Sequence, residues 1–101
     1  MQIATGTYVG TGGPGPVSRV TGLSGLLKHV RISGFGPGAG RMRETFKTDT
    51  MGVPQAVDDL GNLFNDGRLL FSGPNFLVDD ASGGDTPNIA GILYTWIAWT
   101  D

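Results

Sequence analysis

The sequence predicts an all-β fold, and three features of the chain predict it. Short runs of β-branched and aromatic residues with an alternating apolar pattern recur along the chain, as they do in half-buried strands. Clusters of glycine, proline, asparagine and aspartate separate these runs every ~8–12 residues, which is typical of a sandwich or barrel. No long segment repeats its apolar residues with the period of a helix. We expect a small antiparallel β-sandwich or barrel of about seven or eight short strands, formed by residues 1–101 as a single domain.

In the first half of the chain, strands are expected at residues 2–9, 17–21 and 26–33. Threonine and tyrosine in the first strand favour a pleated, half-buried surface. In the third strand, alternation directs Val30 and Ile32 toward the interior and His29 toward the outside. The glycine-rich segments 10–16 and 34–40 are expected to be loops, because glycine and proline break regular structure.

In the second half, residues 41–47 alternate, and we expect the even-numbered side chains of this strand to face the interior. Residues 49–53 either continue that strand or pair with it. A helical turn is expected at 54–60, because Pro54 suits the first position of a helix and Gly61 follows its end.

A hairpin is expected around the Asp66-Gly67 pair. Aspartate followed by glycine supplies the positive φ angles of a tight turn. The strands on either side of the pair, 62–64 and 68–71, should therefore bond to each other.

The last two expected strands are 75–79 and 92–99. In the final strand seven of the eight side chains are apolar or aromatic, so both of its faces are apolar. An antiparallel sheet usually has one face in water, whereas neither face of this strand suits water. We expect protein on both sides of it, with the second cover supplied by another sheet of the chain or by a neighbouring subunit. This pattern favours an assembly protein over an enzyme.

The composition restricts how such a chain can be stabilised. Eighteen of its 101 residues are glycine, and glycine loses more backbone freedom on folding than any other residue. The chain has no cysteine and a single histidine, His29, so disulfides are excluded and a thiolate or histidine metal site is not expected. Small domains in this position commonly oligomerise, and we expect a homo-oligomer.

Charge and hydropathy exclude several kinds of partner. Seven basic and nine acidic residues give a formal net charge of −2, which does not suit nucleic-acid binding. No apolar run approaches the length of about eighteen residues that a membrane-spanning helix needs. Residues 1–5 do not have the pattern of a secretory leader. We expect synthesis in the cytoplasm without export by the general route.

Candidate binding loops carry weak signals. The segments 10–16 and 34–40 lack the Lys-Ser/Thr pair of a phosphate-binding P-loop and the helix that follows a dinucleotide loop. Asp79, Asp80 and Asp85 share one loop, but their spacing is not that of a calcium-binding EF-hand, and aspartate is an ordinary turn former. We expect no cofactor and no metal site, and cation binding by the acidic loop stays an open alternative.

Catalytic residues are not expected either. Asp58 and Asp59 are adjacent, so their side chains diverge and are expected at a solvated edge. His29 has no cysteine partner and no nucleophile-elbow motif to support a triad. Three basic side chains share one face of the strand at 41–47 and are expected to protect an edge strand or to pair with acidic residues at an assembly interface. These are Arg41, Arg43 and Lys47.

Aromatic side chains gather at the end of the chain, where Tyr94, Trp96 and Trp99 could stack on a sugar. Packing in a core or at a subunit interface is the commoner role of such residues on an apolar strand, and we assign them to packing. The full set of expected core and interface residues is Tyr8, Phe76, Tyr94, Trp96, Ile97 and Trp99.

Two segments of the chain resemble a known family. The first segment contains Gly6-Thr7-Tyr8 followed by Gly10 and Gly12. The second contains Phe76, Val78, Asn88, Gly91, Tyr94, Trp96, Ile97, Ala98 and Trp99. In residues 1–12 and 76–101 the chain is similar to small β-rich virion proteins of tailed bacteriophages. The middle of the chain departs from that pattern, because Leu26 to His29 stand where relatives tend to have Gly-Phe-x-Pro-Lys.

The resemblance implies a β-sandwich that assembles as a trimer on the particle surface or at a tail appendage. The first hypothesis is a capsid decoration (cement) protein that contacts further copies and the major capsid or tail protein, and is located in the virion. The alternative is a receptor- or glycan-binding tail fibre or tail tip module that recognises a host surface glycan. An enzyme, such as a glycan hydrolase, is the least favoured hypothesis. The step from fold to function is analogy.

Overall fold

The structure is a computed structural model that describes residues 1–13, 15–36, 40–41, 44–80 and 86–101. In that part of the chain the strands are β1 (Gln2–Val9), β2 (Val17–Arg19), β3 (Leu27–Gly36), β4 (Gly40–Arg41), β5 (Thr45–Thr48), β6 (Gln55–Asp58), β7 (Leu63–Asn65), β8 (Leu69–Ser72), β9 (Asn75–Val78) and β10 (Leu93–Thr100). The prediction of a small antiparallel all-β fold is confirmed.

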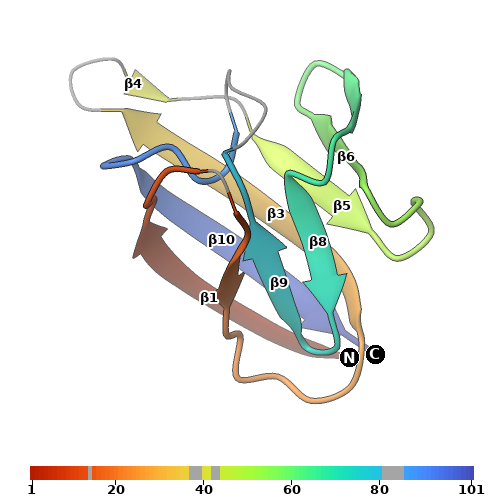
Figure 1. The fold of residues 1–101 in the computed structure, drawn as a ribbon. Coiled ribbons are helices and arrows are strands. Elements are labelled where there is room, and N and C mark those ends of the chain that lie inside the picture. The colour runs from red at the N-terminus through yellow and green to blue at the C-terminus, as the bar shows by residue number, and fades with distance from the viewer. Residues whose placement is uncertain (14, 37–39, 42–43, 81–85) are drawn as a thin grey trace.

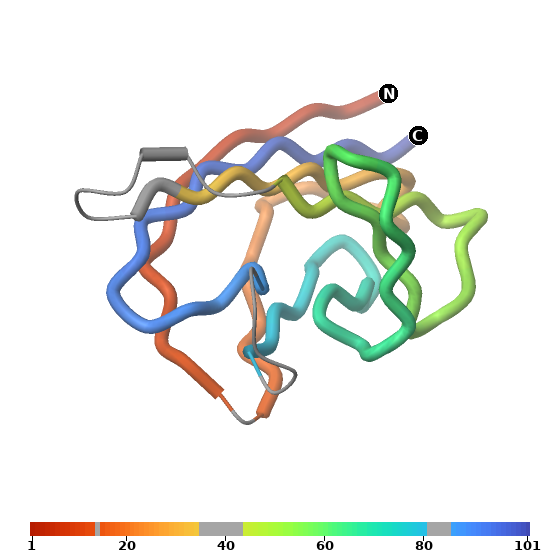
Figure 2. Tube along the Cα trace, turned by 90° about the horizontal axis from the view of Figure 1, so that it is seen from above, coloured from red at the N-terminus to blue at the C-terminus, as the bar shows by residue number. Residues whose placement is uncertain are grey.

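The strands form two antiparallel sheets. The larger sheet has the order β1-β10-β3-β5-β6-β7, with β4 paired to the far end of β3. The smaller sheet has the order β2-β9-β8 and lies against one face of the larger (Figures 1 and 2). We call the covered side of the larger sheet its inner face and the other side its outer face. Both chain termini lie at the same end of the larger sheet (Figure 1).

The core lies between the two sheets. Its buried side chains come from the inner face of the larger sheet, from the smaller sheet and from the segment before β10. They are Tyr8, Leu27, Val30, Ile32, Ala56, Leu69, Phe76, Val78, Ile92, Tyr94 and Ala98. Val30 and Ile32 therefore point inward as alternation predicts, and Phe76 and Val78 share one face of β9.

Two glycines allow aromatic rings of β10 to lie flat on the inner face. Gly6 of β1 is the register partner of Trp96, and a Cβ at Gly6 would lie 2.5 Å from the indole. Gly34 of β3 is the partner of Tyr94, and a Cβ there would lie 2.7 Å from the phenol ring. Each ring thus covers a glycine of the neighbouring strand, which brings the two aromatic side chains close to the sheet.

The final strand is covered by its own chain on one face only. Tyr94 and Ala98 are buried under the smaller sheet, at 2% and 0% exposure. On the opposite face Leu93 is 46% exposed, and Ile97 and Trp99 are half-buried among outer-face neighbours. The described part of the chain therefore covers the inner face of β10, as expected, but does not cover the outer face.

The helical turn expected at 54–60 is wrong. Residues 55–58 form strand β6, which pairs with β5 and with β7. A helical segment of this length would not hold by itself, whereas pairing on both sides satisfies the backbone. Asp58 is also not at a solvated edge. It is 6% exposed, and its carboxylate accepts bonds from the N–H groups of Leu60 and Asn62, both at 2.9 Å.

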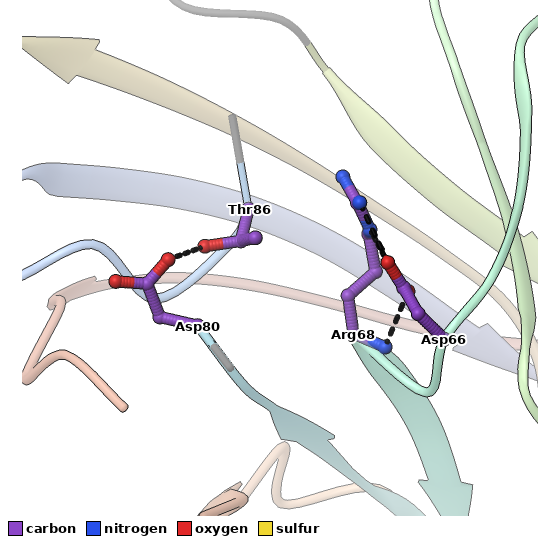
Figure 3. A network of polar contacts seen from close by, with 4 residues as sticks. All are labelled: Asp66, Arg68, Asp80 and Thr86. Atoms are coloured by element: carbon purple, nitrogen blue, oxygen red, sulfur yellow. Dashed lines mark hydrogen bonds and ion pairs between the residues drawn. The ribbon is translucent and has the colours of Figure 1, made fainter. Parts of the chain in front are cut away.

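The hairpin expected around Asp66-Gly67 is also wrong. The turn exists, and Gly67 has a φ of 73°, but it carries the chain from β7 in the larger sheet to β8 in the smaller. Arg68, 6% exposed, pairs with Asp66 at 2.7 Å beside this crossing (Figure 3). Its guanidinium lies 3.6 Å from the centre of the Phe64 ring. A short turn signal therefore did not decide which strands pair.

The inward face expected for residues 41–47 is wrong where the structure describes it. Thr45 and Lys47 point inward, each 3% exposed, and Phe46 points outward. The register with β3 explains the reversal, because Ile32 and Val30 pair with Thr45 and Lys47 and share their face. Residues 49–53 form the connection between β5 and β6 rather than a strand.

Candidate functional site

The outer face of the larger sheet is the most distinctive surface of the molecule. Alternation from the buried positions places here the odd-numbered side chains of β1 and β10, together with His29, Arg31 and Ser33 of β3 and Phe46 and Thr48 of β5. Six of these side chains are apolar. They are Ile3, Val9, Phe46, Leu93, Ile97 and Trp99.

Several of these apolar side chains are well exposed. Ile3 is 56% exposed, Val9 55% and Leu93 46%. Among the described residues of this face the formal charges belong to Arg31 and, at its margin, to Glu44. Val9 and Leu93 pair at one end of the face and Ile3 pairs with Trp99 at the other, with threonine side chains between them. Exposed apolar side chains with few charges around them are typical of an interaction site, since interface cores are depleted in charged residues.

Aromatic rings stack on one another across this face. The His29 ring lies 4.1 Å from the Trp99 ring, with the planes 9° apart. On the other side of β3, the Phe46 ring of β5 is stacked with the His29 ring, with ring centres 6.1 Å apart. The Arg31 guanidinium lies 5.5 Å from the centre of the Phe46 ring. Burial first, and the charge of Arg31 second, lower the pKa of His29. The imidazole is therefore neutral at pH 7 and adds no charge to the face.

A shallow depression of about 430 Å³ crosses the same face. Its lining is rich in hydroxyl groups, and Thr7, Thr95 and Ser33 follow one another in register across three strands. Ser33 Oγ donates a hydrogen bond to Glu44 Oε1 at 3.0 Å, and Arg31 and Ile97 also line the depression. These groups can accept and donate hydrogen bonds, but no pair of carboxylates converges among the described lining residues.

The structure separates the six residues that the sequence analysis assigned to packing. Tyr8, Phe76 and Tyr94 lie in the core. Trp96 points inward as well, packing edge-on against Phe76 with ring centres 5.5 Å apart. The two remaining residues, Ile97 and Trp99, lie on the outer face. Tyr94, Trp96 and Trp99 thus do not share a face and do not form a common sugar-stacking platform.

The two core tyrosines hold the segment before β10 onto the sheet. Tyr8 Oη donates to the carbonyl of Pro87 at 2.5 Å, and Tyr94 Oη donates to the carbonyl of Thr86 at 2.9 Å. Tyr94 Oη also accepts the N–H of Ile89 at 2.9 Å. Burial, followed by the neighbouring Tyr94, raises the pKa of Tyr8. These hydroxyl groups therefore hold residues 86–89 against the sheet.

At the start of the first glycine-rich loop, the backbone N–H groups of Gly10 and Gly12 are already bonded within the chain and are not available to bind a phosphate. The backbone N–H of Gly10 donates to the Ile92 carbonyl at 2.9 Å and that of Gly12 to the Asn88 carbonyl at 2.8 Å. Asn88 Oδ1 accepts the N–H of Thr11 at 3.1 Å. A Cβ at Gly10 would lie 2.0 Å from the carbonyl oxygen of Ile89, which explains the glycine. The second loop, expected at 34–40, is wrong where the structure describes it, because 34–36 continue β3 and Gly40 begins β4. Residues 37–39 lie outside the described residues.

The acidic loop is only partly described. Asp80 is hydrogen-bonded to the hydroxyl of Thr86 (Figure 3), and Asp79 accepts the N–H of Gly15 at 3.2 Å. Asp85 lies outside the described residues. Among those described, no group of three or more histidine, cysteine, aspartate or glutamate side chains is arranged to hold a metal ion.

Lys47 is a buried basic residue that the sequence analysis placed on the surface. Its Nζ donates to the carbonyls of Gly52, Val53 and Gln55, at 2.7, 3.0 and 2.6 Å. Burial lowers the pKa of Lys47, while the three carbonyl acceptors suit the three donors of the ammonium. Lys47 therefore organises the β5–β6 connection, and does not protect an edge. Arg43 lies outside the described residues, as does the side chain of Arg41.

A second depression, of about 280 Å³, lies beside Lys47. Its walls are largely apolar and come from the beginning of β3, the β5–β6 connection and β8. Leu26 and Val53 are 69% and 79% exposed at this site. Lys47 Nζ is already bonded to three carbonyl oxygens. Lys28, which also lines the depression, is paired with Asp49 and Asp101.

Comparisons with protein-family models, with curated proteins and with solved structures found no match to this chain. No helix long and apolar enough to cross a membrane occurs in the described residues.

Proposed function

We propose that the protein is a structural component of a phage virion, most specifically a capsid decoration protein that binds the particle through the outer face of its larger sheet. The observation that supports an assembly role is the exposure of Leu93, Ile3 and Val9 on one face of the sheet, with few charges around them. The phage assignment is supported by the resemblance of residues 1–12 and 76–101 to small virion proteins.

Burial of the outer face would drive the assembly. Each Å² of apolar surface removed from water contributes roughly 25 cal/mol, part of which offsets the loss of rotational and translational freedom. The rings of Trp99, His29 and Phe46 are already fixed by stacking, so little side-chain entropy remains to be lost on binding. The partners are further copies of the chain, for which the resemblance implies a trimer, and the major capsid or tail protein.

A receptor-binding tail module is the second candidate, and the hydroxyl-lined depression supports it. Thr5, Thr7, Thr95 and Ser33 offer hydroxyl groups and Arg31 a cation at one site, a combination that can bind a host glycan. The ring faces that sugars commonly stack on are less available, because Trp99 lies against His29. The outer face as a whole therefore favours protein contact over glycan contact.

The proposal is tested by placing a charge on the outer face. Leu93→Asp should abolish co-purification of the protein with particles. Leu60→Asp is the matched control, because Leu60 is equally apolar and 63% exposed but lies in the β6–β7 connection. It should leave particle binding and native mass unchanged. Particles lacking the protein should release their contents at a lower temperature than complete particles.

The copy number separates the two candidates. A decoration protein is present at near-shell stoichiometry, whereas a receptor module is present in few copies and binds cells or sugars when isolated. Normal particle binding by the Leu93→Asp variant would contradict the assignment of the outer face to assembly.

A further inference from the structure

Strand β1 is a long edge strand with one free side. It pairs with β10 in continuous register from Gln2↔Thr100 to Val9↔Leu93, and it ends the strand order of the larger sheet. Figures 1 and 2 show it as the outermost strand on that side. In an antiparallel ladder, alternate residues direct their N–H and C=O groups to opposite sides. Half of the backbone groups of β1 therefore face away from β10.

The free groups belong to the odd-numbered residues. The N–H of Gly10 donates to the carbonyl of Ile92 at 2.9 Å, which continues the β1–β10 register and assigns the even-numbered residues to β10. At the end of the strand, the Val9 carbonyl accepts a bond from the Arg19 guanidinium at 3.3 Å. Its outward direction agrees with this alternation. The stretch from Ile3 to Thr7 is left for a further strand.

This edge lacks the features by which proteins normally prevent strand addition. Such edges are usually short, bulged, charged or interrupted by proline. β1 is eight residues long, contains no charged residue and no proline, and pairs with β10 without a register shift. The opposite edge of the same sheet is β7, which has only three residues. Of the two edges, β1 is therefore the one suited to pairing with a further strand.

We propose that the Ile3–Thr7 edge binds the same edge of a second copy of the chain, with the two β1 strands antiparallel about a two-fold axis. Antiparallel pairing of a strand with itself is self-complementary, as a two-fold contact requires. The uncharged sequence brings no like charges together, although each chain carries a net charge of −2. Because the free stretch is centred on Thr5, each Thr5 lies opposite Thr5 of the second copy.

This pairing extends the proposed assembly role and depends on it for its biological meaning. In this register Ile3 lies opposite Thr7 of the second copy, so residues of one face meet residues of the same face. The two outer faces then lie side by side on the same side of the joined sheet. A two-fold contact gives a dimer or a multiple of two, in contrast to the trimer that the resemblance implies.

Amide hydrogen exchange on the unaltered protein tests the pairing directly. The amides of Ala4, Gly6 and Tyr8 should exchange slowly at every protein concentration, because they face β10. The amides of Thr5 and Thr7 should become protected only as concentration rises and the native mass doubles. Fast exchange of these two amides in an oligomer would overturn the edge pairing.

Cysteine cross-linking provides an independent measurement in this cysteine-free chain. Thr5→Cys should form a disulfide-linked dimer on mild oxidation, because paired Cα atoms about 5.5 Å apart lie within the range of a disulfide. Thr95→Cys is the matched control. Thr95 has the same side chain on the same face, but two copies of it would be separated by at least three strand spacings, about 14 Å, and should not cross-link.

The outcomes separate the edge pairing from the proposed function. A protein that is monomeric at all concentrations, or a trimer whose Thr5→Cys variant does not cross-link, overturns the pairing; such a trimer leaves the assembly role intact. A cross-linked dimer that never associates with particles supports the pairing and contradicts the decoration role.

Discussion

The two faces of β10 have similar sequences and different environments. On the inner face Tyr94 and Ala98 are almost completely excluded from water, whereas on the outer face Leu93 is 46% exposed. Both faces are apolar, but only one has a sheet of the same chain against it. The comparison shows that an apolar strand face identifies a surface that avoids water without identifying what covers it.

Polar groups differ between the faces in the same way. On the inner face the hydroxyls of Tyr8 and Tyr94 donate to the backbone carbonyls of Pro87 and Thr86. On the outer face Thr5, Thr7 and Thr95 are exposed to solvent. Polar groups of the inner face therefore contribute to the fold, while those of the outer face are accessible to a partner.

The largest expected difference, between the core and the outer face, comes from truncation of an apolar side chain. Phe76→Ala, at a fully buried position, should lower the free energy of unfolding by about 4 kcal/mol. Ile97→Ala, on the outer face, should lower it by about 1 kcal/mol in the monomer, because the side chain is half-exposed. Urea unfolding measures both. Equal losses would contradict the division of the sheet into a core face and a free face.

A basic side chain should also behave differently on the two faces. Lys47→Met removes three hydrogen bonds to backbone carbonyls and should lower the free energy of unfolding by about 2 kcal/mol. Arg31→Met, on the exposed side of the adjoining strand, should change it by less than about 0.5 kcal/mol. A lower free energy of unfolding for Arg31→Met than for Lys47→Met would contradict the assignment of Lys47 to the inner face and Arg31 to the outer face.

Loss of a single hydroxyl gives a finer comparison between adjacent residues of β10. Tyr94→Phe leaves the N–H of Ile89 and the carbonyl of Thr86 without their common partner, and should cost about 1.5 kcal/mol. Thr95→Val removes an exposed hydroxyl on the other face and should be neutral to within about 0.5 kcal/mol. Thermal and urea unfolding of the two variants measure the difference.

Trp99→Ala should affect assembly more than folding. The indole is half-buried against His29, so its loss should lower the free energy of unfolding of the monomer by about 1 kcal/mol. If the outer face is a subunit contact, the native mass should fall and particle binding should weaken. A variant that assembles normally would remove Trp99 from the interface.

The smallest expected effect is the pH dependence of His29. Its pKa is lower in the folded chain than the ordinary value of 6.5, so below about pH 6.5 the unfolded chain binds more protons. Stability should therefore fall as the pH drops through 6.5 toward the folded pKa. His29→Gln should remove this slope, because the chain has one histidine. A slope that persists between pH 6.5 and pH 5 would assign it to another group.

Local patterns were sufficient for the strands whose neighbours share their preference. Residues 2–9 form a strand with the expected bounds, because threonine, tyrosine and valine suit a pleated surface. Phe76 and Val78 fall on one buried face for the same reason. Asp66-Gly67 was correctly identified as a turn. Its role as a crossing between sheets was missed, since turn chemistry determines a local bend and not the partners of the flanking strands.

The site was only partly predictable. The apolar outer side chains of β10 are evident from residues 92–99. The sequence also shows that residues 2–9 lack charge and proline, but only the strand order shows that β1 lies at an edge. Lys47 was placed outside because lysine is normally exposed. Lys47 is buried instead because three backbone carbonyls of residues 52–55 accept hydrogen bonds from its ammonium group. These carbonyls come together only when β5 and β6 pair.

By itself the sequence determined that this chain forms short antiparallel strands, where most of them lie, and that both faces of the last one are apolar. The tertiary structure decided which face became the core, which strands pair across turns, and which strand ends the sheet with a free edge. The physical reason is that a period of two defines two equivalent faces. The choice between them depends on the register and packing of strands that are distant in the chain, and not on any local run of residues.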